Sequence, residues 1–340
     1  MSDPASRNNQ LHQGAGPGSS AKSVDVSACI VNWNCKEMLR GCLQSLRSQA
    51  PEVRLEVFVV DNASSDGAPA MVAREFPEVF LLRNADNLGF AKANNRAARL
   101  ASGRYLFFLN NDTVVPPGAI RRLLEYAEAH PEVGMIGPRL RDGEGQLQAS
   151  YRCRPTLAAL LHRTSILRWT GLLHGAYRRY RRQRFDAEHL GRVELLIGAA
   201  VFLPRRAFLE CGPWDEGYVF GGEDLDLSTI VGRKYDVVYL PSVELTHYGR
   251  VGTRQNVGFC FSHTLTGLAR YLRRTGCSPL ALIAYKLIVS LDAPVQFVGK
   301  AIQYVWRRLR GQDRKAQQSL LAWRGFRHFL TRGLIPFWRA

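Results

Sequence analysis

The stretch LEVFVV at residues 55–60, followed at once by DNASSDG at residues 61–67, decides the fold class. The first part is almost entirely apolar and rich in valine, which is typical of a short buried strand. The second part consists mostly of Asp, Asn, Ser and Gly, which favour turns. The pattern predicts a buried strand whose end opens into a polar loop.

Strands and helices alternate on both sides of this stretch. Apolar runs at residues 26–31, 79–82 and 105–109 predict three further strands. Apolar residues recur at helical spacing between residues 38 and 46, and a helix is also expected from about residue 89 to residue 101. Helices that connect successive strands in this way predict an α/β domain with a mostly parallel sheet and helices on both faces.

Polar side chains follow three of the predicted strands at the point where each strand ends. Asn32 and Asp61 come directly after their strands, and Asp112 lies just beyond a third. Ligands bind beyond the carboxyl ends of the strands in open parallel sheets. We therefore expect these three polar loops to form one ligand site.

Three carboxylates lie behind a glycine pair in GGEDLD at residues 221–226. Glu223, Asp224 and Asp226 are each candidates for a general base that takes the proton of an attacking hydroxyl. The same acids would also stabilise a helix N-terminus, on which Glu223 and Asp226 share a face and Asp224 points elsewhere. The glycine pair favours the close approach of a ligand.

Asp112 and an isolated histidine, His247, are candidates for a metal site. Hard oxygen ligands suit Mg²⁺ or Mn²⁺, which take few protein ligands and complete their shell with phosphates. Such an ion would neutralise a phosphate leaving group, although a lone histidine is more often structural. A helix that opens at Gly89 with Lys92 in its first turn is a second candidate phosphate site.

Five motifs occur in order: VNWN at residues 31–34, VVDNASSDG at 59–67, NLGFAKANN at 87–95, LNNDT at 109–113 and GGEDLDLS at 221–228. With these motifs the chain resembles the family-two inverting glycosyltransferases with the GT-A fold. The most similar branch is the rhamnosyltransferase-like one, and the match runs from about residue 26 to residue 250. The resemblance implies a Rossmann-like GT-A domain over residues 24–255.

The resemblance also implies a role for each matching residue. Asp224, in the Glu223–Asp224 pair, would be the catalytic base, and Asp112 with His247 would bind the metal. The first acid of the family's metal motif is Asn110 here, which removes one charge from the site. The donor-binding residues, with Asn32 and Asp61 at the nucleobase or ribose, would be Asn32, Asp61, Asn62, Gly89, Lys92, Asn94 and Asn111.

Two segments fit the alternating pattern less well. The basic residues 152–184 resist assignment, and we interpret them as a mobile insertion. Residues 194–203 predict one strand with Gly198, Ala199 and Ala200 inside it. These small residues either admit a closely approaching group or mark a bulge, and the resemblance places them on the acceptor side.

The chain is strongly basic, with a formal net charge of +17, and residues 270–340 carry fourteen Lys/Arg against two Asp. This asymmetry favours an anionic partner over a merely solvated basic face. We expect basic amphipathic helices over residues 256–340 that associate with a membrane interface, rather than a plain helical cap. Lys286, Asp292 and Pro294 interrupt the longest apolar window, which argues against a spanning helix.

Seven cysteines without a Cys-x-x-Cys pair predict neither a disulfide framework nor a zinc site, as is typical of a reducing compartment. Residues 1–23 are polar and have no apolar signal-peptide core, so we expect a disordered tail. Together with the basic C-terminal region, this predicts a cytoplasmic protein peripheral to the inner face of the cell membrane.

The resemblance implies an enzyme that moves rhamnose or another hexose from a dTDP- or UDP-linked donor to a hydroxyl of a lipid-linked glycan in surface-polysaccharide synthesis. A catalytically inactive, membrane-associated sugar-nucleotide-binding protein is the alternative. A nucleotidyltransferase is disfavoured because VNWNC at residues 31–35 lacks a glycine-rich, basic signature. Nucleic-acid binding is disfavoured because no recognition motif accompanies the charge.

Overall fold

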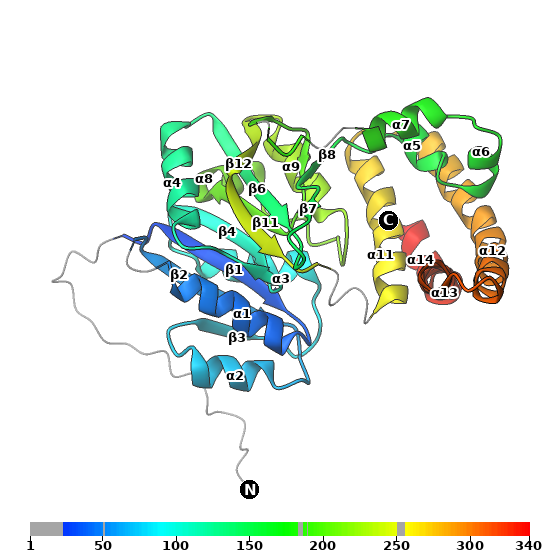
Figure 1. The fold of residues 1–340 in the computed structure, drawn as a ribbon. Coiled ribbons are helices and arrows are strands. Elements are labelled where there is room, and N and C mark those ends of the chain that lie inside the picture. The colour runs from blue at the N-terminus through cyan, green and yellow to red at the C-terminus, as the bar shows by residue number, and fades with distance from the viewer. Residues whose placement is uncertain (1–22, 50–51, 183–185, 189, 250–255) are drawn as a thin grey trace, which may run out of the picture.

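The chain folds into a central sheet with a lobe of helices beside it (Figure 1). The computed structural model describes residues 23–49, 52–182, 186–188, 190–249 and 256–340. The predicted disordered tail lies, up to residue 22, outside these described residues.

The sheet contains ten strands, which are β1 (Val26–Asn32), β2 (Leu55–Asp61), β3 (Phe80–Arg83), β4 (Tyr105–Asn110), β5 (Thr113–Val114), β6 (Val133–Arg141), β7 (Leu147–Gln148), β9 (Gly191–Arg192), β11 (Ala200–Pro204) and β12 (Asp236–His247). Its main order is β3-β2-β1-β4-β11-β6-β12-β5, and β8 (Tyr151–Arg152) pairs with β10 (Leu195–Leu196) outside it. Strands β3, β2, β1 and β4 are parallel, as is the β6–β12 pair, while β11 and β5 run antiparallel to their neighbours. The predicted mostly parallel sheet is confirmed.

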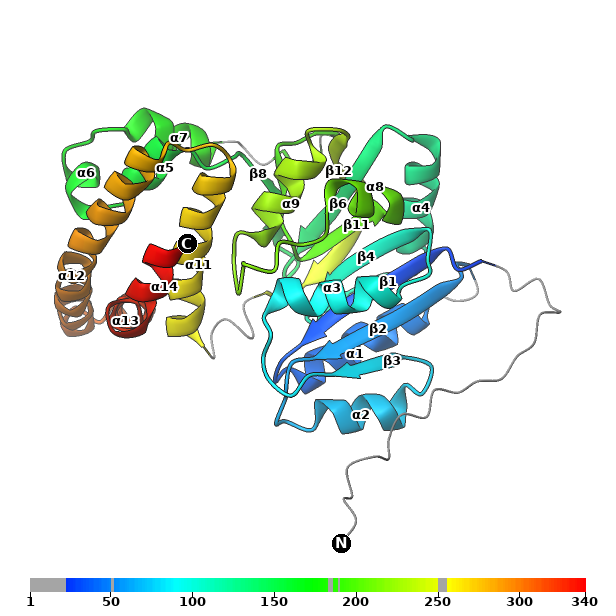
Figure 2. The ribbon, with the colours of Figure 1, turned by 180° about the vertical axis from the view of Figure 1, so that it is seen from behind.

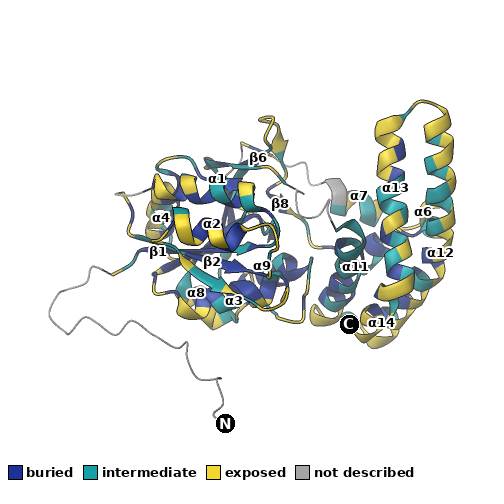
Figure 3. Ribbon diagram, turned by 90° about the horizontal axis from the view of Figure 1, so that it is seen from below, coloured by how far each residue is buried: buried dark blue, intermediate teal, exposed yellow. Residues whose placement is uncertain are grey.

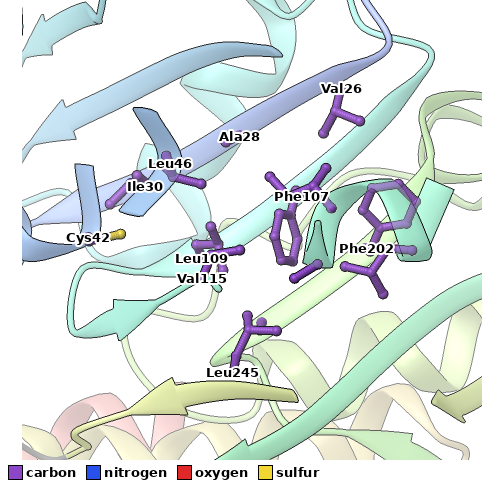
Figure 4. Packing of buried hydrophobic residues seen from close by; sticks show 14 of the residues in the cluster. Val26, Ala28, Ile30, Cys42, Leu46, Phe107, Leu109, Val115, Phe202 and Leu245 are labelled. Atoms are coloured by element: carbon purple, nitrogen blue, oxygen red, sulfur yellow. The ribbon is translucent and has the colours of Figure 1, made fainter. Parts of the chain in front are cut away.

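Helices cover both faces of the sheet. One face carries α1 (Lys36–Arg47), α2 (Ala68–Glu75) and α4 (Ala119–Ala129), and the other carries α3 (Phe90–Leu100), α8 (Arg205–Cys211) and α9 (Glu223–Val231) (Figures 1 and 2). On the first face Ile30 and Leu109 of the sheet pack with Cys42 and Leu46 of α1 (Figure 4). Strands that are buried on both faces consist of continuous apolar residues, which is why they could be predicted from the sequence.

The lobe consists of α5 (Leu157–Leu161), α6 (Ser165–Trp169), α7 (His174–Arg182), α11 (Val257–Arg274), α12 (Pro279–Leu309), α13 (Asp313–His328), the π-helix η1 (Phe329–Gly333) and α14 (Leu334–Arg339). The mobile insertion predicted for residues 152–184 is therefore wrong over its described part. Thr156 Oγ1 caps α5 by accepting the Ala159 N–H at 3.2 Å, and Leu160 packs into the core of the lobe. These residues order because α12, far along the chain, supplies an apolar surface for them.

Helix α12 runs without a break through Pro294. Its two charged residues before that proline face the interior of the lobe. Lys286 Nζ donates to the carbonyl oxygen of Trp338 at 3.0 Å, and Asp292 Oδ1 accepts the N–H of Ser165 at 2.8 Å. Both charged side chains are buried and hydrogen-bonded, so they interrupt the apolar sequence without adding to the exposed surface of the helix. Among the described residues, α12 is the one helix long and apolar enough to cross a membrane.

Helix α11 packs directly against the glycine pair that precedes α9. Gly221 and Gly222 have φ of 79° and 107°, and a Cβ on Gly267 would lie 1.8 Å from the Gly221 carbonyl oxygen. The close approach that we expected a ligand to make is therefore made by the backbone of α11. The glycines at this crossing bring the lobe into contact with the acid cluster.

Three ion pairs add to the same junction, since Arg274 also lies 3.2 Å from Asp215. Asp215 accepts hydrogen bonds from Arg270 at 2.8 and 2.9 Å, and Arg274 Nε lies 2.9 Å from Asp226 Oδ1. Both arginines are on α11, and both carboxylates are largely buried. The junction between sheet and lobe is thus fixed by close packing and by charge.

The substitution Gly267→Ala should destabilise the protein because its Cβ has no room beside Gly221. Overpacking of this kind costs about 1–3 kcal/mol. We expect a lower urea midpoint and a lower melting temperature. The control Gly299→Ala lies in α12 with no atom within 4 Å of the added Cβ and should be neutral or stabilising. Equal stability of the two variants would contradict the close packing of α11.

Candidate active site

The carboxyl ends of β1, β2 and β4 are joined by a network of buried polar side chains. Asn32 Nδ2 donates to Asp61 Oδ1 at 3.1 Å, and Asn111 Nδ2 donates to Asn32 Oδ1 at 2.7 Å. The second carboxylate oxygen of Asp61 accepts the N–H of Ser64 at 2.9 Å. The structure thus brings these predicted residues together, with Asn32 and Asp61 almost fully buried and holding the loops in place.

A cavity of about 200 Å³ lies beyond this edge. Among the predicted donor-binding residues, Asn62, Gly89 and Asn111 line it, together with Asp112. The other predicted donor-binding residues do not belong to its lining; these are Asn32 and Asp61, Lys92, which is exposed on α3, and Asn94, which is buried and donates to the Phe90 carbonyl at 3.2 Å. Ligand pockets usually measure roughly 300–1,000 Å³, so this cavity is smaller than a typical ligand pocket.

Gly89 allows two walls of the cavity to meet. Its φ is 81°, and a Cβ there would lie 2.5 Å from the carbonyl oxygen of Val219. Asn62 Nδ2 donates to the Gly89 carbonyl at 3.2 Å. Only glycine fits this conformation beside a neighbouring backbone, so the first turn of α3 abuts the loop that leads to the acid cluster.

Asp112 and His247 meet although they lie far apart in the sequence. Strand β12 pairs with β5, which places His247 opposite Thr113 and next to Asp112. His247 Nε2 lies 3.3 Å from Asp112 Oδ1 and 3.3 Å from Asn110 Nδ2. The two metal-ligand candidates predicted from the sequence therefore share one site.

Gln148 on β7 fixes the orientation of the His247 ring. Its Oε1 lies 2.8 Å from His247 Nδ1, and its Nε2 donates to the His247 carbonyl at 2.6 Å. An amide oxygen only accepts hydrogen bonds, so Nδ1 carries a proton and Nε2 is the ring nitrogen that faces Asp112. The sequence analysis missed Gln148, because a residue of a two-residue strand carries no periodic signal.

Asp112 and His247 fit a divalent cation. Asp112 Oδ1 and His247 Nε2 lie 3.3 Å apart, and a carboxylate oxygen and an imidazole nitrogen are both ligands of divalent cations. The described residues contain no group of three or more His, Cys, Asp or Glu able to hold a metal. Two protein ligands are consistent with Mg²⁺ or Mn²⁺, which leave their other positions to phosphate oxygens and water.

Asp224 reaches this edge through a break in the strand predicted for residues 194–203. That prediction is wrong, because the chain forms β10, turns, and starts β11 at Ala200. In the turn, the Gly198 N–H donates to Asp224 Oδ2 at 3.3 Å, and a Cβ on Gly198 would lie 3.2 Å from that of Asp224. Ala199 accepts the Asn110 N–H at 2.9 Å. The group that the small residues admit is thus the side chain of Asp224, next to the end of β4.

The three acids of the cluster have different environments. Burial, and then the neighbouring Asp224, raise the pKa of Glu223 to about 8. Glu223 Oε2 has no hydrogen-bond partner within the described part of the chain. Both carboxylate oxygens of Asp226 accept hydrogen bonds from Arg274 Nε. Asp224 is the least buried of the three, which makes it the one best placed to meet a substrate.

Comparisons with known proteins agree with this geometry. The model of the glycosyl transferase family 2 matches residues 27–190. The N-acetylglucosaminyl-diphospho-decaprenol L-rhamnosyltransferase of Mycobacterium tuberculosis is 32% identical over 219 residues, which cover 59% of this chain and 69% of that one. An O-antigen biosynthesis protein of Myxococcus xanthus is 28% identical over 67% of this chain and 18% of its own length.

A solved structure shares the fold. The mannosyltransferase of Pyrobaculum calidifontis, solved with GDP-Man and Mn²⁺, superposes with a TM-score of 0.51 at 17% identity, over 89% of this chain and 86% of that one. Sheet, polar edge and relatives together define a glycosyltransferase. The chain belongs to glycosyl transferase family 2, and within it to the rhamnosyltransferase-like branch. The resemblance predicted from the five motifs is confirmed.

The substitution Gln148→Ala should weaken the binding of Mn²⁺, because the His247 ring would lose the partner that orients it. Loss of such an outer partner typically lowers metal affinity by roughly 10–100-fold. Calorimetric titration of Mn²⁺ into the protein with saturating nucleoside diphosphate measures this. Gln146→Ala, exposed in the same hairpin, is the control. Unchanged Mn²⁺ affinity in Gln148→Ala would refute the orienting role.

Proposed function

We propose that this glycosyltransferase is an inverting enzyme that transfers a hexose from a nucleoside diphosphate donor to a hydroxyl of a lipid-linked glycan. Rhamnose is the first candidate for the sugar, and dTDP or UDP for the nucleotide. The observation that carries the proposal is the position of Asp224. The turn at Gly198 holds it beside the end of β4, at the edge where Asp112 and His247 meet.

Asp224 is suited to accept a proton. Its two carboxylate oxygens accept the N–H groups of Gly198 at 3.3 Å and Leu225 at 3.0 Å, which hold the carboxylate in position. An acceptor hydroxyl attacks the anomeric carbon from the face opposite the diphosphate. Its proton passes to Asp224 as the new bond forms, and the diphosphate leaves with the electron pair of the old one. One displacement inverts the anomeric centre without a covalent enzyme intermediate.

The leaving diphosphate must be neutralised as it departs. A Mg²⁺ or Mn²⁺ ion held by Asp112 and His247 would supply that positive charge. Asn62, Gly89 and Asn111 line the adjoining cavity and are placed to contact the nucleotide part of the donor. The name of the Mycobacterium tuberculosis relative, which specifies a lipid-linked acceptor and rhamnose, supports the same choice of substrates here.

The substitution Asp224→Asn should abolish sugar transfer and leave donor binding largely intact, because the amide keeps the shape of the side chain but cannot take the proton. Loss of a general base typically lowers the rate by about 10²–10⁴-fold. Calorimetric titration with dTDP, UDP and GDP, with and without Mn²⁺, measures binding, and product formation measures transfer.

An equal loss of nucleotide affinity in Asp224→Asn would contradict its assignment as the base. Metal-enhanced binding of one nucleotide by the unaltered protein, with no transfer to any acceptor, would instead favour the inactive sugar-nucleotide-binding protein. The absence of nucleotide binding altogether would refute the proposed function.

The exposed face of α12 supports association with a membrane (Figure 3). Every exposed residue between Pro279 and Trp306 is apolar: Pro279, Leu280, Ile283, Ala284, Leu287, Leu291, Pro294, Val295, Val298, Ile302, Val305 and Trp306. An apolar stripe of this length is typical of helices that lie in a membrane interface. We propose that this stripe rests on the cytoplasmic face of the cell membrane, where a lipid-linked acceptor is found.

The double substitution Leu291→Gln and Ile302→Gln should weaken binding to lipid vesicles without a change of net charge. Burying a leucine or isoleucine side chain contributes about 1.5–3 kcal/mol, so we expect more than a tenfold loss in co-sedimentation with anionic vesicles. The control Leu100→Gln with Leu209→Gln removes exposed apolar side chains from α3 and α8 instead. Equal retention of both double variants on the vesicles would refute the proposed membrane face.

A further inference from the structure

A second and larger cavity lies in the lobe, next to the first. Its volume is about 550 Å³. One wall is the first turn of α11, and the other is a face of α13 and η1 that presents Arg324, Arg327 and Arg332. No acidic residue belongs to its lining. The cavity therefore has the size of a ligand pocket and a strongly positive lining.

The three arginines have no acidic partner within the described part of the chain. Each is exposed, and no carboxylate of the described residues lies within ion-pair distance of any of them. Elsewhere in the lobe, Arg270 and Arg274 are paired with carboxylates. Like charges on neighbouring helical turns repel one another weakly, and an anion bound between these guanidinium groups would relieve that repulsion.

The wall that carries the arginines is held firmly against α11. A Cβ on Gly258 would lie 2.8 Å from the Cβ of His328, and a Cβ on Gly325 would lie 2.7 Å from the ring of Phe261. The hydroxyl of Ser262 is hydrogen-bonded to His328 Nδ1 at 2.8 Å. Close helix packing of this kind positions the arginines, which favours a binding site over a loose basic surface.

Phe259 lies between the two cavities, because it belongs to the lining of both. Its ring lies 6.4 Å from that of Trp33, which lines the donor-side cavity. A ligand in the arginine-lined cavity is therefore separated from the cavity lined by Asn62 and Asn111 by the aromatic residue Phe259. Helix α13, which carries Arg324 and Arg327, also packs along α12, whose outer face is apolar.

We propose that the arginine-lined cavity binds the diphosphate that links the acceptor glycan to its lipid. This inference rests on the proposed function, since it names where that acceptor is held. A diphosphate matches the paired donors of guanidinium groups. From this position the lipid chain can extend toward the apolar face of α12, while the sugar extends past Phe259 toward the donor. The leaving diphosphate of the donor belongs to the other site, at Asp112 and His247.

The test uses the full chain and two probes, inorganic pyrophosphate and farnesyl diphosphate, titrated in EDTA so that metal-dependent binding at Asp112 does not contribute. The double substitution Arg324→Gln with Arg327→Gln should weaken both probes by about tenfold or more, since each charged hydrogen bond contributes appreciably to affinity. The matched control Arg314→Gln with Lys315→Gln removes the same charge from exposed α13 positions outside the cavity and should leave probe affinity unchanged.

Nucleotide titration of the same proteins separates the two hypotheses. Nucleotide affinity should be equal in the unaltered protein and in both double variants. If the unaltered protein binds nucleotide but neither probe, or if both double variants weaken the probes equally, the cavity does not bind a diphosphate and the inference fails. If the protein binds no nucleotide, the proposed function fails. The probe titrations then decide separately whether the arginine-lined cavity binds a diphosphate.

A phosphate of the membrane surface has the same chemistry as the acceptor diphosphate. Vesicles of phosphatidylglycerol and of neutral phosphatidylcholine distinguish the two sources. The inference expects Arg324→Gln with Arg327→Gln to lose farnesyl diphosphate affinity while its vesicle binding matches that of the control variant. Unchanged farnesyl diphosphate affinity with a selective loss on phosphatidylglycerol would assign the cavity to lipid headgroups and overturn the proposal.

Discussion

The hydrogen bonds of one buried amide, Asn32, hold the reactive edge of the sheet together. This side chain donates to Asp61 and accepts from Asn111, so it connects the ends of β2, β1 and β4. Because a buried polar group is costly when it loses its partners, these three strand ends cannot move independently. These hydrogen bonds therefore also fix the cavity next to the strand ends and the loop that carries Asp112. The carboxylate of Asp61 thus holds the loops beside the cavity in place, whether or not it also contacts a ligand.

The helical lobe belongs to the same structural unit as the sheet. Gly267 of α11 packs on Gly221, and Arg274 neutralises Asp226, two residues from Asp224. A change in the position of α11 is therefore transmitted directly to the acid cluster. The helix that continues the chain, α12, has an outer face made of apolar residues. The proposed membrane face of α12 is in this way connected, through α11, to the helix that carries the proposed base.

The sequence predicted the first half of the sheet because its central strands, β1 and β4, are buried on both faces and are followed by turn residues. It could not predict contacts between distant segments. Nothing in the local pattern around Gly198 says that Asp224 fills the space beside it, or that Lys286 and Asp292 face the interior. The contact between Gln148 and His247 could not be predicted for the same reason, since Gln148 reaches His247 only when β7 pairs with β6. Periodicity reports burial along one element, whereas these sites depend on which elements become neighbours.

The acid cluster shows how one short segment acquires three different functions. Glu223 is buried, and its pKa of about 8 keeps it largely neutral near pH 7. A neutral Glu223 adds no negative charge beside Asp224, whose carboxylate is held in position by two backbone N–H groups. Asp226 is neutralised by Arg274 and fixes the helix. Three neighbouring acids of one short segment thus lie in three different environments. The division depends on α11, which supplies both the arginine and the packing surface.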